Sequence, residues 1–209
     1  MPRRSNYKTL ERTFTFDRPS TSALAFVVLA CALFLAGCGK GGGINGLHVK
    51  SPATGEKDMV VKSSYAFAVT KTFADAAGKM TTASSYRVYA ASYDLDSSNF
   101  AMTMDKPLTS EDHVRVVFSL VGEQGGNDKS AVKAGTYSAK ADKFMKVEDV
   151  AIVSRKGSAD NKAWLDRSTL TGDVKVTSAS ADEISGEVDL TSGNTSIKGS
   201  FRAKILKRR

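Results

Sequence analysis

The sequence predicts an all-β protein, an antiparallel β-sandwich or β-barrel of roughly eight to ten strands. Three observations support this class. From Met59 onward, apolar and polar residues alternate in short runs rich in Val, Tyr, Phe and Thr, which is typical of half-buried strands. Segments rich in Gly, Asn and Asp separate these runs, as turns do. No stretch after Met59 has apolar residues spaced three and four apart over the length of an amphipathic helix.

Strands are expected along the whole of this region. In its first half, the alternating runs are residues 60–73, 85–95, 99–104 and 113–122. The last of these runs gives the strongest signal, with four large apolar residues on one side: Val114, Val116, Phe118 and Leu120. Glycines interrupt the alternation at residues 74–82 and 122–129, so we expect loops there.

The second half contains the clearest pattern. Two strands are expected at residues 135–141 and 147–155, followed by a polar loop at 156–162. A three-strand meander is expected at residues 173–177, 184–190 and 196–206. In its last strand, apolar and polar residues alternate from Ile197 to Ile205, which predicts one buried face and one solvated face.

An apolar run without charged residues lies near the start of the chain, at residues 24–36. As a helix it would be roughly 20 Å long, whereas the hydrocarbon core of a bilayer is about 30 Å thick. Basic residues precede the run: Arg3, Arg4, Lys8, Arg12 and Arg18. A short apolar run after basic residues and before small ones is typical of a secretory signal helix, here residues 1–37, which is cleaved off.

The run ends in Leu35-Ala36-Gly37-Cys38, and these residues resemble the lipobox of bacterial lipoproteins. The resemblance covers residues 24–38 and implies cleavage before Cys38, attachment of lipid to its sulfur and acylation of the new amino terminus. Two or more acyl chains hold a protein firmly at a membrane, whereas one does so only marginally. The alternatives are an ordinary signal peptide with a chance cysteine and a twin-arginine signal at Arg3-Arg4.

The lipobox resemblance also implies a location. Gly39, rather than Asp, follows the cysteine, which resembles the pattern for delivery to the outer membrane of a Gram-negative cell, with the domain on the periplasmic face. Residues 38–58 are rich in Gly, so we expect a flexible linker in which His48 is solvated. Residues 59–209 then form one β-rich domain, and no family is recognised for it.

The net charge of +8 is concentrated at the two ends of the chain. Basic and acidic residues are equal in number between Cys38 and Phe201, so the excess charge of the mature chain lies at its C-terminus. This end is a candidate for contact with an anionic surface, such as phosphate groups or lipopolysaccharide. The basic residues concerned are Lys198, Arg202, Lys204, Lys207, Arg208 and Arg209. Protection of a sheet edge from aggregation is the role we favour for them.

Few residues in the mature chain are suited to catalysis. Cys31 lies in the signal helix and Cys38 carries the lipid, so no thiol remains for a disulfide, a metal or a nucleophile. The chain has two histidines, His48 and His113, and no G-x-S-x-G motif. Nucleophilic catalysis, a zinc site and a cofactor are therefore not expected.

A weak calcium candidate lies at Asp94, Asp96, Ser98 and Asp105, which have the spacing of oxygen ligands in an EF-hand loop. Asn99 stands where the loop requires Gly, and the flanking residues predict strands rather than helices. We therefore expect a polar turn in which side-chain oxygens cap the backbone.

Two further sets of residues have the chemistry of functional sites. Paired carboxylates suited to glycoside hydrolysis occur at Glu111-Asp112, Glu148-Asp149 and Asp182-Glu183, each in an expected turn. Aromatic residues that could line a glycan or apolar-ligand site are Tyr65, Tyr86, Tyr89, Tyr93, Tyr137 and Trp164. Solvated turns and ordinary strand packing are the expected roles of these two sets.

The sequence thus favours a lipid-anchored envelope protein with a non-catalytic binding or scaffolding domain. Its partners would be the membrane, through the lipid on Cys38, and an envelope protein, a glycan or an anionic lipid. Nucleic acid is not expected as a partner of an exported protein with a neutral body. The alternatives are an envelope hydrolase that uses paired carboxylates and a β-barrel carrier of an apolar ligand.

Replacing Cys38 by Ser should abolish incorporation of labelled palmitate in cells, because the sulfur that accepts the lipid is lost. Cys31→Ser is the matched control and should leave labelling intact, since Cys31 lies in the segment that is cleaved off. Labelling that survives in Cys38→Ser would contradict the anchor.

Overall fold

The computed structural model describes residues 45–98 and 105–207, and it confirms the all-β class. None of these residues belongs to a helix with the length and apolar character needed to cross a membrane. The described strands are β1 (Gly46–Ser51), β2 (Gly55–Val60), β3 (Ser63–Ala74), β4 (Met80–Ala91), β5 (Val114–Gln124), β6 (Gly135–Ser138), β7 (Lys146–Lys156), β8 (Ala159–Trp164), β9 (Thr171–Ala179), β10 (Glu183–Ser192) and β11 (Thr195–Ile205).

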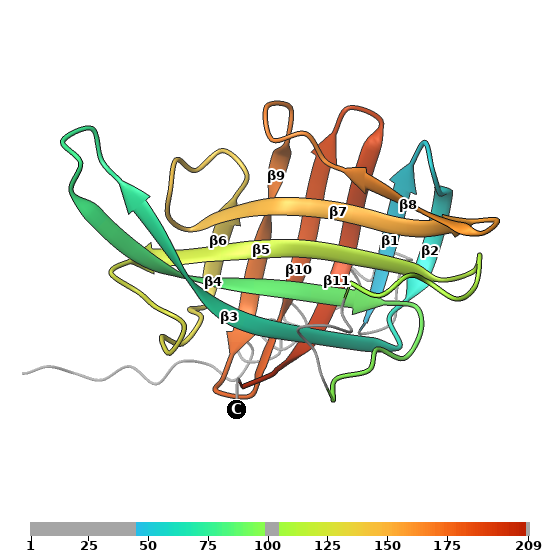
Figure 1. The fold of residues 1–209 in the computed structure, drawn as a ribbon, viewed down its shortest axis with the longest axis horizontal. Helices are drawn as coiled ribbons and strands as arrows, with labels where there is room; N and C mark the ends of the chain where they lie inside the picture. Colours follow the sequence, from blue (N-terminus) through green and yellow to red (C-terminus); the bar gives the residue numbers. More distant parts are fainter. Residues whose placement is uncertain (1–44, 99–104, 208–209) are drawn as a thin grey trace, which may run out of the picture. The chain divides into compact units, whose positions relative to one another are not determined.

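The strands form one mixed sheet that closes into a ring. Eight strands make the ring, in the order β11-β10-β9-β6-β7-β5-β4-β3. The pairing of β3 with β11 closes it. The β1–β2 hairpin is added at β11, and β8 is added at β7. Most pairs are antiparallel, but β3–β11 and β6–β7 are parallel. In Figure 1, β3, β4, β5 and β7 run side by side and cross β9, β10 and β11 at a steep angle.

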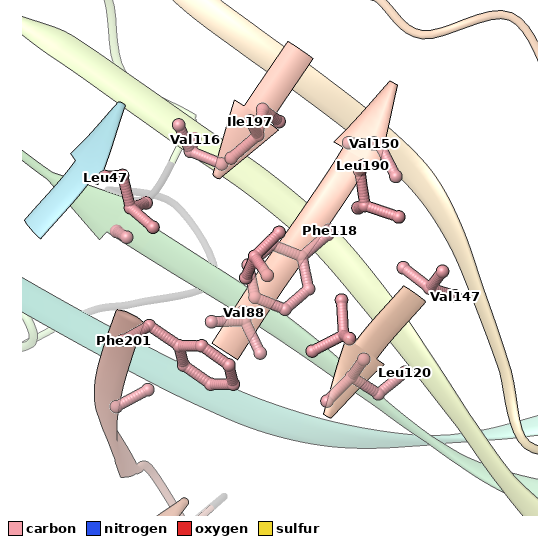
Figure 2. Packing of buried hydrophobic residues seen from close by; sticks show 14 of the residues in the cluster. Leu47, Val88, Val116, Phe118, Leu120, Val147, Val150, Leu190, Ile197 and Phe201 are labelled. Carbon is pink, nitrogen blue, oxygen red and sulfur yellow. The ribbon is translucent and has the colours of Figure 1, made fainter. Parts of the chain in front are cut away.

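Large apolar side chains fill the space inside the ring. Phe118 of β5 meets Phe201 of β11 edge to face, with 5.3 Å between the ring centroids. Figure 2 shows Val88 and Val116, from β4 and β5, on the same side of their strands as Phe118, with Leu190 of β10 beside it. The side chains from both halves of the ring therefore form one continuous core, and the alternation expected in residues 113–122 is confirmed.

The C-terminal meander is also as expected. β9, β10 and β11 pair antiparallel in sequence order, and their inward side chains, such as Val174, Val188 and Ile197, are buried. The outward face carries alternating acidic and basic side chains, including Lys175 and Asp189. The apolar face of this antiparallel meander packs in the core, and its charged face meets the solvent.

The expected linker is shorter than predicted, because β1 and β2 occupy residues 46–60. Leu47, Val49 and Met59 are at most 2% exposed and belong to the core. Gly199 lets β1 approach β11 closely, since a Cβ at this position would lie 2.2 Å from the Gly46 carbonyl oxygen. The high Gly content suggested a flexible linker. The strand forms because Leu47 and Val49, two residues apart, point to the same side and pack in the core.

Other boundaries also differ from expectation. The polar loop expected at residues 156–162 contains a turn at Gly157 and most of β8, which pairs with β7 and is largely exposed. An exposed strand needs no apolar alternation, so its sequence resembles a loop. The loop expected at residues 74–82 is shortened by both flanking strands. The strand expected at 99–104 lies outside the described residues.

His48, which was expected to be solvated in the linker, lies on β1 between two carboxylates of β2. Its Nδ1 is 2.7 Å from Asp58 Oδ1, and its Nε2 is 3.1 Å from Glu56 Oε1. The hydrogen bond with Asp58 raises the pKa of His48 above its ordinary value of 6.5, and the charges of both carboxylates act in the same direction.

Asp58→Asn should therefore lower the pKa of His48 toward 6.5, as measured by NMR titration of its ring protons. In the native protein, the stabilisation of the β1–β2 hairpin by these pairs is complete below pH 6.5 and is lost as the pH rises through the folded-state pKa. Glu56→Gln is the matched control and should have the smaller effect. An unchanged His48 pKa in Asp58→Asn would contradict this assignment.

Candidate functional site

A pocket of about 470 Å³ lies beside the point where β11 meets β3. Five separate segments line it: β3, β4, the loop after β5, the β9–β10 turn and the end of β11. Its apolar lining consists of Ala68, Tyr86, Ala131, Ala181, Ile205 and Leu206. Its polar lining consists of Asp128, Lys129, Ser180 and Lys207. We call this the closure pocket.

The pocket exists because β11 and β3 touch only briefly. Their pairing is limited to Lys204 with Tyr65 and Ile205 with Ala66, after which the Leu206 amide donates to the Ala66 carbonyl at 2.7 Å. β3 continues to Ala74, but β11 ends at Ile205. The continuing part of β3 therefore has no strand beside it on the β11 side, and the pocket occupies this position.

The loop after β5 borders the pocket and is fixed to β3. The Asp128 amide donates to Thr70 Oγ1 at 3.0 Å, and the Thr70 hydroxyl donates to Asp128 Oδ1 at 3.2 Å. Asn127 and Ser130 close a turn within this loop, with the Ser130 amide donating to the Asn127 carbonyl at 3.0 Å. These bonds hold Lys129 at the rim.

The β9–β10 turn forms the opposite border. The Ile205 amide donates to the Asp182 carbonyl at 2.7 Å, and Lys207 Nζ lies 2.8 Å from Asp182 Oδ1. The hydrogen bond and charge of Lys207 lower the pKa of Asp182 below its usual range. The turn and the end of β11 lie together at one end of the strands (Figure 1), so this border is anchored by both main chain and side chain.

Tyr86 supplies the largest side chain of the pocket. It is 5% exposed, and its hydroxyl donates to the Ser130 carbonyl at 2.7 Å. Burial raises the pKa of Tyr86 above 10.0, so the phenol is neutral at physiological pH and remains a donor. Tyr86 thereby joins the core to the loop that borders the pocket.

The two lysines at the rim differ in whether they form an ion pair. Lys129 has no ion pair within the part of the chain that the structure describes, whereas Lys207 is paired with Asp182. The carboxylate of Asp128 accepts the hydrogen bond of Thr70. The pocket thus combines an apolar floor with two ammonium groups, of which one lacks a carboxylate partner.

The structure places only one described residue of the predicted basic group at the pocket, Lys207. Three of the group are paired with acidic residues: Lys198 with Asp189 at 3.1 Å, Arg202 with Glu183 at 3.3 Å and Lys207 with Asp182. Lys204 lies opposite Glu183 in the β10–β11 register, and Arg208 and Arg209 lie outside the described residues. β11 is not a sheet edge, because it pairs with β10 on one side and with β1 and β3 on the other. The sheet edge that we expected is therefore absent at Lys198 and Lys204, which lie in these paired stretches.

The calcium candidate forms a capped turn. Asp96 Oδ1 accepts hydrogen bonds from the Ser98 amide at 2.9 Å and from the Ser98 hydroxyl at 2.6 Å. These bonds lower the pKa of Asp96. Asp105 lies 3.5 Å from the Tyr89 hydroxyl, and residues 45–98 and 105–207 contain no group of three or more side chains placed to hold a metal ion. The hydrogen bonds of Asp96 with Ser98 are those of the polar turn that we expected here.

The acidic pairs do not come together. Glu111 accepts a hydrogen bond from the Gly157 amide, and Asp182 belongs to the closure pocket border. Glu148 and Asp149 lie within β7, which agrees with the strand expected at residues 147–155, so the turn expected at this pair is wrong. Asp149 has φ of 52° at an irregularity in the β5–β7 register, and an extra residue in a strand disturbs the alternation that predicts it. Glu148 is 5% exposed and is paired with Lys71 and Arg167.

The aromatic residues also separate. Tyr86 and Tyr137 point into the core, and the Tyr137 hydroxyl donates to the Lys133 carbonyl at 2.9 Å. Tyr65, Tyr89 and Tyr93 belong to a second apolar cluster, which also contains Val117 of β5. Trp164 is 53% exposed on β8, with Lys162 Nζ 4.2 Å from its ring centroid. Of the predicted set, only Tyr86 lines the closure pocket.

No family model, curated protein or solved structure matches this chain. Sequence reasoning did not find Ala68, Ala131, Ala181 or Lys129, because small residues from distant segments carry no motif. Of the basic residues that the sequence singled out at the C-terminus, Lys207 lines the pocket.

Tyr86→Phe should destabilise the protein by about 0.5–1.5 kcal/mol, because the Ser130 carbonyl loses its hydrogen bond while the core volume is kept. Urea unfolding measures this difference. Tyr65→Phe is the matched control and should be nearly neutral, since the Tyr65 hydroxyl has no hydrogen bond in the described structure. Equal stability of Tyr86→Phe and the native protein would contradict the role given to this bond.

Proposed function

We propose that this protein is an envelope lipoprotein whose β-domain is a non-catalytic binding module for a small apolar or amphipathic ligand. The lipid on Cys38 would tether it to the membrane, on the periplasmic face of the outer membrane of a Gram-negative cell. The observation that carries the proposal is the closure pocket, which has an apolar floor and a volume within the range of about 300–1,000 Å³ typical of ligand sites.

The packing of the ring supports binding at its end rather than inside it. Phe118 and Phe201 meet in the enclosed space, and both are at most 1% exposed. A carrier with an internal cavity would need this space for its ligand. The closure pocket instead opens between segments at the end of the ring, where a ligand can enter without displacing the core.

The lining of the pocket favours binding over hydrolysis by paired carboxylates. Among its described lining residues, Asp128 is the one carboxylate, and it accepts the Thr70 hydrogen bond. Glycoside hydrolysis of this type uses two carboxyl groups flanking the scissile bond. The apolar side chains from five segments are better suited to holding an apolar group.

The short tether supports a ligand from the membrane region. Cys38 precedes Gly46, the first residue of β1, by eight residues, which span at most about 28 Å when fully extended. This distance is close to the thickness of the hydrocarbon core of a bilayer, about 30 Å. A lipidated Cys38 would therefore keep the domain near the membrane surface.

Binding is tested with N-phenyl-1-naphthylamine, a neutral apolar probe whose fluorescence rises in an apolar site. The chain from residue 38 onward, with Cys38→Ser, retains every described residue and should bind the probe saturably at one site. Ala181→Trp places a large ring in the pocket from an exposed position and should weaken binding by at least tenfold.

Ala159→Trp is the matched control, because Ala159 is also exposed but lies on β8 away from the pocket lining. It should bind the probe like the native sequence. Absence of binding, or equal binding by Ala181→Trp and the native sequence, would contradict the proposed site.

A further inference from the structure

We infer that the closure pocket selects an amphipathic anion, an acyl or alkyl chain that ends in a carboxylate or phosphate group. This inference rests on the proposed function, because it assigns the ligand class of the same pocket. Lys129 and Lys207 would hold the anionic head, and the apolar floor would hold the chain.

The unpaired ammonium group of Lys129 is the first argument. The bonds of the neighbouring loop residues Asp128 and Asn127 fix the Lys129 backbone at the rim, since the Lys129 amide donates to Asn127 Oδ1 at 2.9 Å. The Lys129 side chain has no carboxylate within ion-pair distance in the described structure. A cation next to an apolar floor gains most from an anion that the ligand itself brings.

The Lys207–Asp182 pair is the second argument. Its two side chains are 69% and 76% exposed, respectively. Exposed ion pairs of this kind contribute little to stability. Lys207 can therefore exchange Asp182 for the head group of a ligand at small cost, while the Asp182 carbonyl keeps its bond to the Ile205 amide.

Asp128 brings a negative charge to the rim, and β3 holds its carboxylate. Asp128 is the one carboxylate among the described lining residues, and its Oδ1 is directed to the Thr70 hydroxyl of β3. The anion would thus lie toward Lys129 and Lys207, and the chain toward Ala68, Tyr86 and Ile205. The Tyr86 phenol is neutral and adds no charge. Its hydroxyl already donates to the Ser130 carbonyl.

Displacement of N-phenyl-1-naphthylamine by three twelve-carbon compounds tests the inference. Dodecanoate and dodecyl phosphate should each displace the probe at a concentration at least tenfold below that of dodecanol, and the better of the two identifies the head group. Because a buried CH₂ contributes about 0.8 kcal/mol, each added carbon from octanoate to dodecanoate should tighten binding by up to about fourfold.

Lys129→Met should remove most of the preference for the anions over dodecanol, with the affinity for the neutral probe measured beside it. Lys129→Arg should retain the preference, since the charge is kept. Lys140→Met is the matched control, because Lys140 is exposed and lies outside the pocket lining.

Equal displacement by dodecanol and the two anions would overturn the inference but not the proposed function, because the probe would still bind. An unchanged anion preference in Lys129→Met would likewise overturn it. Failure of the probe to bind the native sequence would overturn both.

Discussion

Two residue pairs between β3 and β11 close the sheet, and the rest of the structure depends on this contact. Lys204 pairs with Tyr65 and Ile205 with Ala66, in parallel orientation. The Leu206 amide extends the contact by one bond to the Ala66 carbonyl. A sheet left open here would expose the edges of both strands and the apolar faces behind them. A short contact therefore determines both the enclosed core and the pocket beside it.

The ring has a size that side chains can fill. Eight strands give an interior just wide enough for packed side chains or one small ligand. In this protein the side chains take the space, and Phe118 and Phe201 are among them, in edge-to-face contact (Figure 2). The position available to a ligand is then at the end of the ring, where β11 stops and β3 continues.

Much of the fold could be predicted from the period of two in the sequence. Around Phe118 and from Ile197 to Ile205, large apolar residues recur at every second position. They do so because one side of each strand packs in the core inside the ring and the other side faces away from it. The pattern failed at β8, which is exposed and has no apolar side to alternate. It also failed near Gly46, where glycine content hid a short strand that packs through Leu47.

The closure pocket could not be predicted in the same way. Its lining includes Ala68, Ala131 and Ala181, which are far apart in the sequence and carry no polar side-chain group. Their meeting depends on the parallel contact of β11 with β3, and a parallel contact between strands distant in the chain leaves no local signal. The charge of the C-terminus was visible, but its pairing with Asp182, Glu183 and Asp189 became evident only from the register of β10 and β11.

The most direct measurement is an NMR spectrum of the chain with labelled alanine methyl groups, recorded as dodecanoate is added. Binding at the closing end of the ring predicts that the methyl signals of Ala68, Ala131 and Ala181 shift together and saturate together, while that of Ala159 on β8 stays in place. Shifts confined to other alanines, or no saturable shift in any of the three, would contradict the account.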